Sequence, residues 1–256
     1  GSFEVDTHQL GNDLDFLSWN SSPTGQAEKF TKRLYAPWDS VPEFSYDVGD
    51  PYITGFFHAW VRGAKSKPFW VMQQQVGQTN WGEINPGIRP GTVRLWTWHA
   101  VANGAETVVY FRWRATRFAQ ESYQSGLLKH DGSLDMGYKE IANLLPEAPV
   151  MQQLRDEPLS SPVAILTRFD DLWAIKIQPH RKDYDYLRTA FSYYRALVEL
   201  GISPDLVPYD ADLSKYRLVI APLMYIGDPD IIARLEAYVA RGGSLLLGPR
   251  SGSKNE

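Results

Sequence analysis

Apolar positions along the first half of the chain fall into short continuous runs separated by stretches with helical spacing. Three runs predict buried strands, at 14–19, 68–72 and 107–111. Two intervening stretches predict helices, at 51–63 and 92–103, each ended by a glycine. Nearly continuous apolar strands that alternate with helices are typical of a parallel sheet covered on both faces.

Each of these predicted strands is followed by a loop dense in polar and aromatic residues. Enzymes built on eight-stranded barrels place their active sites at that end of the strands. Three strand–helix units are too few to close such a barrel. We therefore expect residues 1–148 to form only part of a (β/α)8 TIM barrel, corresponding to about its last three βα units.

The second half repeats the alternation after a segment that contains four prolines. Pro146, Pro149, Pro158 and Pro162 predict a linker, with the boundaries of the linker placed at 149–161. Residues 162–256 then read as strands at 163–167, 218–221 and 244–247, and as helices from Leu187 to Val198 and from Asp228-Pro229 to Gly242. This order predicts an incomplete open α/β domain of flavodoxin-like or amidotransferase-like type. The absence of cysteine excludes an active amidotransferase.

Composition narrows the class of protein. Hydrophobic residues make up 43% and charged residues 22% of the 256 residues, as in soluble globular proteins. The net charge of −4 argues against nucleic acid and anionic membranes as partners. No apolar run could span a bilayer, and no signal-peptide pattern is present, so we expect a cytoplasmic protein. The five histidines lack metal-ligand spacing, so neither metal nor cofactor is expected.

Aromatic residues are abundant and concentrated before position 125. They make up 13% of the chain. Aromatic faces suit the apolar C–H faces of sugar rings, and they serve equally well to fill a hydrophobic core. Composition alone leaves both interpretations open.

Three segments carry the densest group of polar and aromatic residues. They are FWVMQQQVGQTNWGEINPGIRPGTVRLWTWHAVANGA at 69–105, YFRWR at 110–114 and AQESYQSGLL at 119–128. Together with LDFLSWNSSPTG at 14–25, they resemble the last part of the catalytic barrel of glycoside hydrolase family 42 β-galactosidases. The resemblance extends into the α/β domain, which in this family mediates trimer formation. It implies retaining hydrolysis of terminal β-D-galactosides.

The resemblance places the catalytic nucleophile at Gln73, where the family has a glutamate after the strand FWVM. A retaining glycosidase needs one carboxylate to attack the anomeric carbon and a second carboxyl group as acid/base. A carboxamide is nearly isosteric with a carboxylate but is uncharged and poorly nucleophilic. The family's acid/base glutamate belongs to a barrel strand outside this chain. We therefore expect the chain alone to be inactive.

The resemblance also implies a set of substrate-binding residues. Trp81 matches a tryptophan that packs against the sugar, Phe111 an aromatic contact, and Glu121 a glutamate that binds galactose hydroxyls. Gln124 stands where many family members have histidine, and Asn20 where many have aspartate. Without the resemblance, Gln73 would be a polar residue at a strand end and Trp81 a loop anchor. Phe111 would be a core aromatic, and Glu121 a solvated helix glutamate.

Three functions remain open from the sequence. The chain is a portion of a β-galactosidase, a galactoside-binding protein that has lost catalysis, or an oligomerisation module. A partial barrel exposes a sheet edge that templates pairing. We therefore expect a partner on that edge, either the N-terminal part of the barrel or another copy of the chain, and a homotrimer for the full-length protein.

Overall fold

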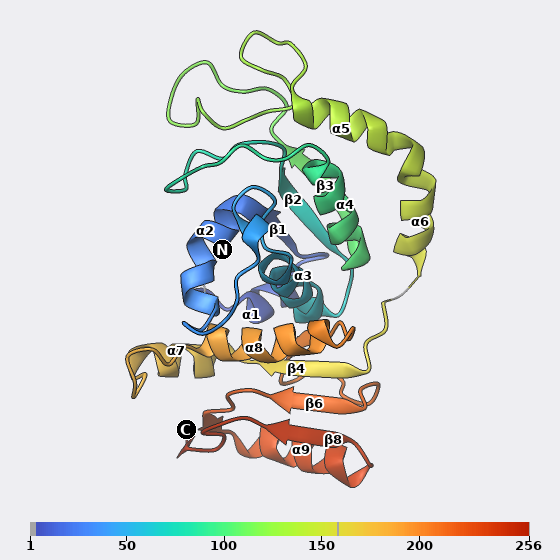
Figure 1. The fold of residues 1–256 in the computed structure, drawn as a ribbon. Helices are drawn as coiled ribbons and strands as arrows, with labels where there is room; N and C mark the ends of the chain where they lie inside the picture. Colours follow the sequence, from blue (N-terminus) through green and yellow to red (C-terminus); the bar gives the residue numbers. More distant parts are fainter. Residues whose placement is uncertain (1–3, 158, 256) are drawn as a thin grey trace.

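A computed structural model describes residues 4–157 and 159–255, whose elements form two groups stacked on one another (Figure 1). Pro158, one of the four prolines of the predicted linker, lies outside these ranges. The first group consists of α1 (Thr7–Asn12), β1 (Ser18–Ser21), α2 (Pro23–Leu34), η1 (Glu43–Ser45), α3 (Pro51–Lys65), β2 (Phe69–Gln75), α4 (Thr92–Ala102), β3 (Ala105–Phe111), α5 (Met136–Leu144), η2 (Leu145–Glu147) and α6 (Ala148–Asp156).

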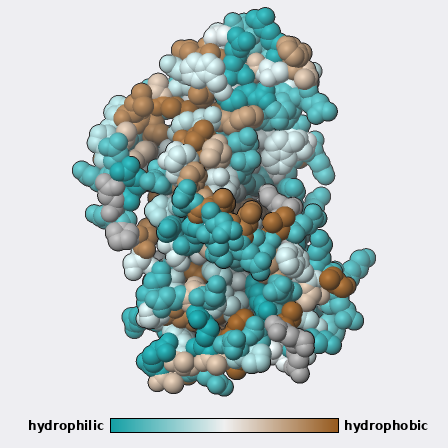
Figure 2. Space-filling model, turned by 180° about the vertical axis from the view of Figure 1, so that it is seen from behind, coloured by the Kyte–Doolittle hydropathy of each residue, from teal (hydrophilic) through white to brown (hydrophobic). Residues whose placement is uncertain are grey.

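The first sheet has the order β1-β2-β3, and all its strands are parallel, as a piece of a TIM barrel requires. Phe69 and Val71 of β2 pack against α4 in a small core. Met72 and Val109, which project from the other face of the sheet, remain 37% and 39% exposed. Apolar patches also interrupt the hydrophilic surface of this half of the molecule when it is seen from behind (Figure 2). The sheet therefore leaves apolar surface for further chain to cover.

The second group surrounds a four-stranded parallel sheet with the order β5-β4-β6-β8. Its elements are β4 (Val163–Thr167), α7 (Phe169–Ile177), α8 (Tyr186–Glu199), β5 (Asp205–Pro208), β6 (Leu218–Ala221), β7 (Ile226–Gly227), α9 (Pro229–Ala240), β8 (Ser244–Leu247) and β9 (Lys254–Asn255). Every residue of β4 is buried. Val163 and Ile165 join the core beneath α7 and α8, while Ala164 and Leu166 join the core beneath α9. This alternation is what a strand covered on both faces produces.

The two groups share one hydrophobic core. Phe30 of α2 and Phe56 of α3 belong to the same buried cluster as Phe191 of α8 and Ile165 of β4. Helix α3 lies directly on β5, because a Cβ at Gly63 would come within 1.7 Å of the Leu206 carbonyl oxygen. The close approach therefore requires glycine at this position.

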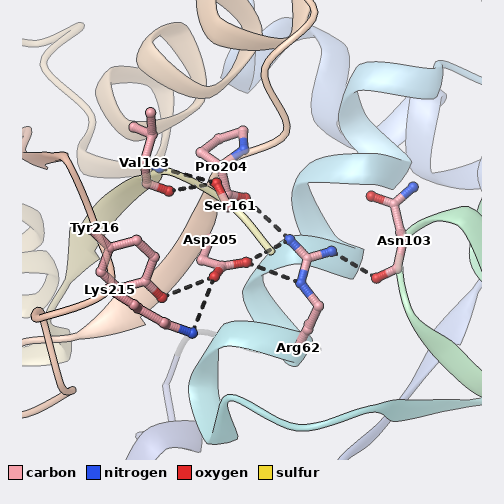
Figure 3. Close-up of polar contacts among 8 residues, drawn as sticks. All are labelled: Arg62, Asn103, Ser161, Val163, Pro204, Asp205, Lys215 and Tyr216. Atoms are coloured by element: carbon pink, nitrogen blue, oxygen red, sulfur yellow. Dashed lines mark hydrogen bonds and ion pairs between the residues drawn. The ribbon is translucent and has the colours of Figure 1, made fainter. Parts of the chain in front are cut away.

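A buried polar network reinforces this contact (Figure 3). The Arg62 guanidinium donates to Asp205 Oδ1 through Nε at 3.2 Å and Nη2 at 2.9 Å, and to the Asn103 carbonyl through Nη1 at 2.7 Å. The Tyr216 hydroxyl donates to Asp205 Oδ2 at 2.9 Å. Both ends of the ion pair are about nine-tenths buried, with side-chain exposures of 9% and 10%. The bonding capacity of the carboxylate is therefore met by protein groups.

Two expectations from the sequence need correction. The strand predicted at 14–19 lies at Ser18–Ser21, and Leu14 and Phe16 before it are exposed instead of buried in a sheet. Phe16 stacks on Trp70 with ring centroids 4.3 Å apart. The helix predicted to end at Gly63 continues to Lys65 and is capped by Ser66 at a φ of 50°. The segment 149–161, predicted as a linker, carries most of α6. Its division from the flanking domains remains a prediction.

Most of the second group was predicted correctly. Strands β4, β6 and β8 have the predicted bounds, and Asp228 caps α9 by accepting from the backbone N–H groups of Asp230 and Ile231. Helix α7 and strand β5 were not predicted. No helix among the described residues has the length and apolar character needed to cross a membrane.

Candidate active site

The carboxyl ends of β1, β2 and β3 meet at one edge of the first sheet, and Gln73 lies there. In the pairing of β1 with β2, Asn20 is the register partner of Gln73. The register shifts between Trp19 and Asn20 on one strand, and between Val71 and Gln74 where β2 meets β3. Bulges of this kind re-aim side chains and are over-represented next to active sites.

The three consecutive glutamines of β2 have three different environments. Gln73 is half-buried, and its carboxamide has no protein hydrogen bond within the described ranges. Gln74 is fully buried, yet neither of its amide atoms has a hydrogen-bond partner among the described residues. Gln75 donates to Thr24 Oγ1 at 2.7 Å and to the Gly77 carbonyl at 2.6 Å. Only Gln75 therefore has an evident structural role, which is to tie β2 to the start of α2.

The loop after β2 carries Trp81, whose side chain is 49% exposed. Its indole lies against α2, since a Cβ at Gly25 would come within 2.4 Å of Cη2 of the indole. The same loop reaches the segment that follows β3. Asn80 Nδ2 donates to the Gln120 carbonyl at 2.9 Å, and the Ser125 N–H donates to the Gln78 carbonyl at 3.0 Å. The loop after β2 is thus hydrogen-bonded to the segment after β3 and packs against α2, which follows β1.

Phe111 ends β3, and the residue after it connects it to Glu121. The Arg112 guanidinium lies 4.9 Å from the centre of the Phe111 ring and donates to the Glu121 carboxylate. Arg112 also donates to Thr116 Oγ1 at 2.5 Å. The Glu121 side chain remains 53% exposed, in a turn and not in a helix. The arginine therefore orients a carboxylate that still faces solvent.

Gln124 follows Glu121 by three residues in the sequence and is 5% exposed. Its backbone N–H donates to the Glu121 carbonyl at 3.1 Å, while its side-chain Oε1 is buried without a partner among the described residues. Buried amide oxygens without a protein partner are uncommon, and each calls for a water, a ligand or strain. Gln124 therefore resembles Gln74 in offering an unsatisfied polar atom near the strand ends.

Asn20 is exposed and borders a groove of about 400 Å³ along the edge strand β1. Apolar side chains dominate the lining of this groove, among them Leu14, Phe16 and Phe30. The Asn20 carbonyl accepts from Gln26 Nε2 at 3.1 Å. Asn20 therefore sits where the carboxyl end of the sheet meets its open edge.

The buried histidines of the first group are structural. Burial lowers the pKa of His99 to about 4 and lowers that of His58 well below its usual value. The indole N–H of Trp19 donates to His58 Nδ1 at 3.2 Å. Exposed His130 bonds to the Ser122 carbonyl at 2.7 Å. Within the described ranges, no group of three His, Cys, Asp or Glu side chains is arranged to hold a metal ion.

Sequence reasoning did not single out Gln74 or Gln75, and it did not predict the pairing of Arg112 with Glu121. The signal for the first two was the run of three glutamines at a strand end, where the pattern alone could not distinguish their environments. The pairing of Arg112 with Glu121 required the turn at 119–124, which has no periodicity.

Comparisons with known proteins cover nearly the whole chain. Residues 2–149 match the Beta-galactosidase family of glycoside hydrolases 42, and residues 161–256 match the Beta-galactosidase trimerisation domain. The chain is 41% identical over 255 residues to Beta-galactosidase BgaH of Haloferax lucentense. This match covers 100% of this chain and 37% of that protein. It is 38% identical over 254 residues to the Beta-galactosidase of Thermus thermophilus. This match covers 99% of this chain and 38% of that protein.

Solved structures give the same result. The Beta-galactosidase from the Antarctic haloarchaeon Halorubrum lacusprofundi superposes with a TM-score of 0.87 at 37% identity, covering 98% of this chain and 36% of that one. The beta-galactosidase from the psychrophilic Marinomonas ef1 superposes with a TM-score of 0.85 at 37% identity. The match covers 97% of this chain and 38% of that one. The chain thus spans less than two fifths of the length of these relatives. On these matches of sequence and structure, the chain belongs to the β-galactosidases of glycoside hydrolase family 42.

Proposed function

We propose that this chain supplies the nucleophile position and the galactose-binding face of a retaining β-galactosidase. Gln73 takes the place of the nucleophile, and Trp81, Phe111, Glu121, Gln124 and Asn20 contact the sugar. The observation that carries the proposal is the position of Gln73 at the irregular carboxyl end of β2, where Asn20 is its register partner. Within the described ranges, the carboxamide of Gln73 has no hydrogen-bond partner in the protein. A family relationship over the whole chain supports the choice of substrate.

Glu121 suits the recognition of adjacent hydroxyls. Its carboxylate can accept from two hydroxyl groups at once, and Arg112 fixes its position. Adjacent axial and equatorial hydroxyls present different geometries to such a carboxylate, which allows galactose to be distinguished from its epimers. The exposed indole of Trp81 offers an apolar face for the sugar ring.

Hydrolysis needs more than this chain holds. In a retaining enzyme, two carboxyl groups about 5–5.5 Å apart share the work of nucleophile and acid/base. Gln73 has no charge with which to attack the anomeric carbon, and the acid/base carboxyl would come from the rest of the barrel. We expect the purified chain to hydrolyse no nitrophenyl β-galactoside above a matched blank.

Association completes the proposal. The N-terminal part of the barrel, or another copy of the chain, would cover the open sheet face around Met72 and Val109, and residues 161–256 would assemble a homotrimer in a cytoplasmic full-length protein. Buried apolar area stabilises such contacts by about 25 cal/mol per Å². Light scattering over a dilution series should show self-association. A well-folded monomer at micromolar concentration would contradict this part.

A second function is favoured by the same glutamine. A carboxamide still hydrogen-bonds to sugar hydroxyls, so a binding protein without catalysis retains everything in this site except the reaction. Reading the chain only as an oligomerisation module predicts self-association without any sugar binding.

Sugar binding is the test that separates these alternatives. Methyl β-D-galactopyranoside should shift NMR signals of the chain, and methyl β-D-glucopyranoside should shift them less. The Glu121→Ala variant should lose this preference, while Glu106→Ala, at the opposite, amino end of β3, should keep it. Equal binding of both sugars, or no binding of either, would contradict the assignment of the site.

A further inference from the structure

The loop that carries Trp81 is held by a carboxylate from a different element. Glu28, on the second turn of α2, accepts hydrogen bonds from three successive backbone N–H groups. Its Oε2 accepts from Glu83 at 2.7 Å and from Ile84 at 3.3 Å, and its Oε1 accepts from Asn85 at 2.9 Å. Successive N–H groups that converge in this way form an anion-binding concavity, and here a side chain of the protein fills it.

The loop is shaped to present these groups. Asn85 has a φ of 50°, in the left-handed region that asparagine tolerates. Its side chain closes a small ring with Gly82, accepting from the Gly82 N–H at 2.7 Å and donating to the Gly82 carbonyl at 2.7 Å. A Cβ at Gly82 would come within 2.4 Å of Glu28 Oε2, so the carboxylate fits against this glycine.

The same helix determines where the indole of Trp81 lies. Gly25 is one turn before Glu28 on α2, and a Cβ there would come within 2.4 Å, 2.6 Å and 3.0 Å of three atoms of the six-membered ring. Bare backbone at Gly25 is therefore the surface on which the indole rests. Glu28 holds the loop just after Trp81 in the sequence, and Gly25 determines where its ring can lie.

We propose that Glu28 and Gly25 are positioning residues for sugar binding: they hold the Trp81 loop so that the indole is already placed for a galactoside ring. This rests on the proposed role of Trp81. A flexible loop of about a dozen residues would lose conformational freedom when the sugar binds, and that cost would lower the affinity. A loop fixed in advance by a charge-assisted triple hydrogen bond avoids most of this loss.

The test compares two charge-neutralising variants in one loop system. Glu28→Gln puts an N–H₂ group against backbone N–H donors. Glu83→Gln is the matched control, because the exposed Glu83 takes part in the clamp only through its backbone N–H. Amide hydrogen exchange measured by NMR should rise about tenfold at Glu83, Ile84 and Asn85 in Glu28→Gln, as expected for a lost bond to a charged group. It should stay unchanged in the control.

Galactoside binding supplies the readout that a merely structural role would not change. Methyl β-D-galactopyranoside is titrated while the indole N–H of Trp81 is followed, its signal assigned with Trp81→Phe. Glu28→Gln should weaken binding about tenfold at an unchanged melting temperature, and Gly25→Ala should weaken it similarly. Gly87→Ala, where a Cβ meets nothing within 4 Å, should bind as the wild type does.

The outcomes are distinct. Unchanged exchange at the three amides in Glu28→Gln overturns the clamp itself. Wild-type affinity in both Glu28→Gln and Gly25→Ala overturns its role in positioning the sugar, while the proposed function stands. If the wild type binds no galactoside, the proposed function fails, and the role of the clamp in sugar binding fails with it. Should Glu28→Gln unfold, Gly25→Ala alone decides the positioning role through its affinity.

Discussion

Buried polar groups near the two ends of the first sheet differ in whether they have hydrogen-bond partners in the protein. At the amino ends of β2 and β3, the Arg62–Asp205 pair has protein partners on both sides and joins the two halves of the molecule. At the carboxyl ends, Gln74 and Gln124 hold buried amide atoms without partners among the described residues. Satisfied polar groups fix a structure, whereas unsatisfied ones indicate a place where something else binds. The difference supports the proposal that the site lies at the carboxyl end.

Removing Asp205 should have the largest effect. Asp205→Ala leaves the Arg62 guanidinium and the Tyr216 hydroxyl buried without their acceptor, and breaking such a pair costs about 3–5 kcal/mol in the free energy of unfolding. Urea unfolding gives the value. Asp183→Ala, which removes a solvent-exposed ion pair with Arg181, is the control and should leave the midpoint in place. A loss at Asp205 no greater than in this control would show that the joint is not held by the buried pair.

The pH dependence of stability should reveal a second buried carboxyl in the α/β domain. Burial raises the pKa of Asp171 to about 7, partly opposed by the hydrogen bond from the Ile226 N–H at 2.8 Å. In an unfolded chain the pKa of the same carboxyl is about 3.9. Between these values the folded state keeps a proton that the unfolded state has released, so the contribution of Asp171 to stability falls as pH rises, by at most about 1.4 kcal/mol per unit.

Unfolding measured from pH 4 to pH 8 checks this. The free energy of unfolding of the wild type minus that of Asp171→Asn should fall over this range, whereas the same difference for Asp230→Asn, on the exposed start of α9, should stay constant. The comparison with the variant is needed because burial lowers the pKa values of His58 and His99, which makes the stability of the wild type rise over part of this window. A difference in the free energy of unfolding between wild type and Asp171→Asn that does not fall from pH 4 to pH 7 would contradict the raised pKa.

The smallest effect should be a gain in stability. Gln74→Leu replaces a buried carboxamide that lacks partners, so the free energy of unfolding should increase by about 1–2 kcal/mol. Gln75→Leu, one residue further, loses its bonds to Thr24 and Gly77 and should lower stability. Thermal unfolding of the two variants gives the comparison. If both lower stability, Gln74 has a structural partner and the contrast between the two ends of the sheet is weaker.

The sequence predicted the second sheet better than the site. Strands β4, β6 and β8 are short apolar runs, which predict buried strands directly. Strand β5 escaped prediction because it begins with Asp205 and ends with Pro208, both typical of loops. Its burial depends on α3, which lies more than a hundred residues earlier in the chain. Contacts of that range leave no local pattern.

The candidate site shows the same limit. The family resemblance named Gln73, Trp81, Phe111 and Glu121, but periodicity could not have done so. The bonds from Glu28 to the loop at 83–85 join positions 55 to 57 residues apart. Nothing in the composition of either segment indicates this contact.

The central claim is that Gln73 occupies the nucleophile position of a β-galactosidase. A chimaera tests it directly, in which this chain replaces the 255-residue span that it matches in the Haloferax lucentense Beta-galactosidase BgaH. The chimaera with Gln73 should not hydrolyse a nitrophenyl β-galactoside, and the same chimaera with Gln73→Glu should hydrolyse it. Hydrolysis by the glutamine form at the rate of the glutamate form, or a folded, galactoside-binding glutamate form without activity, would contradict the account.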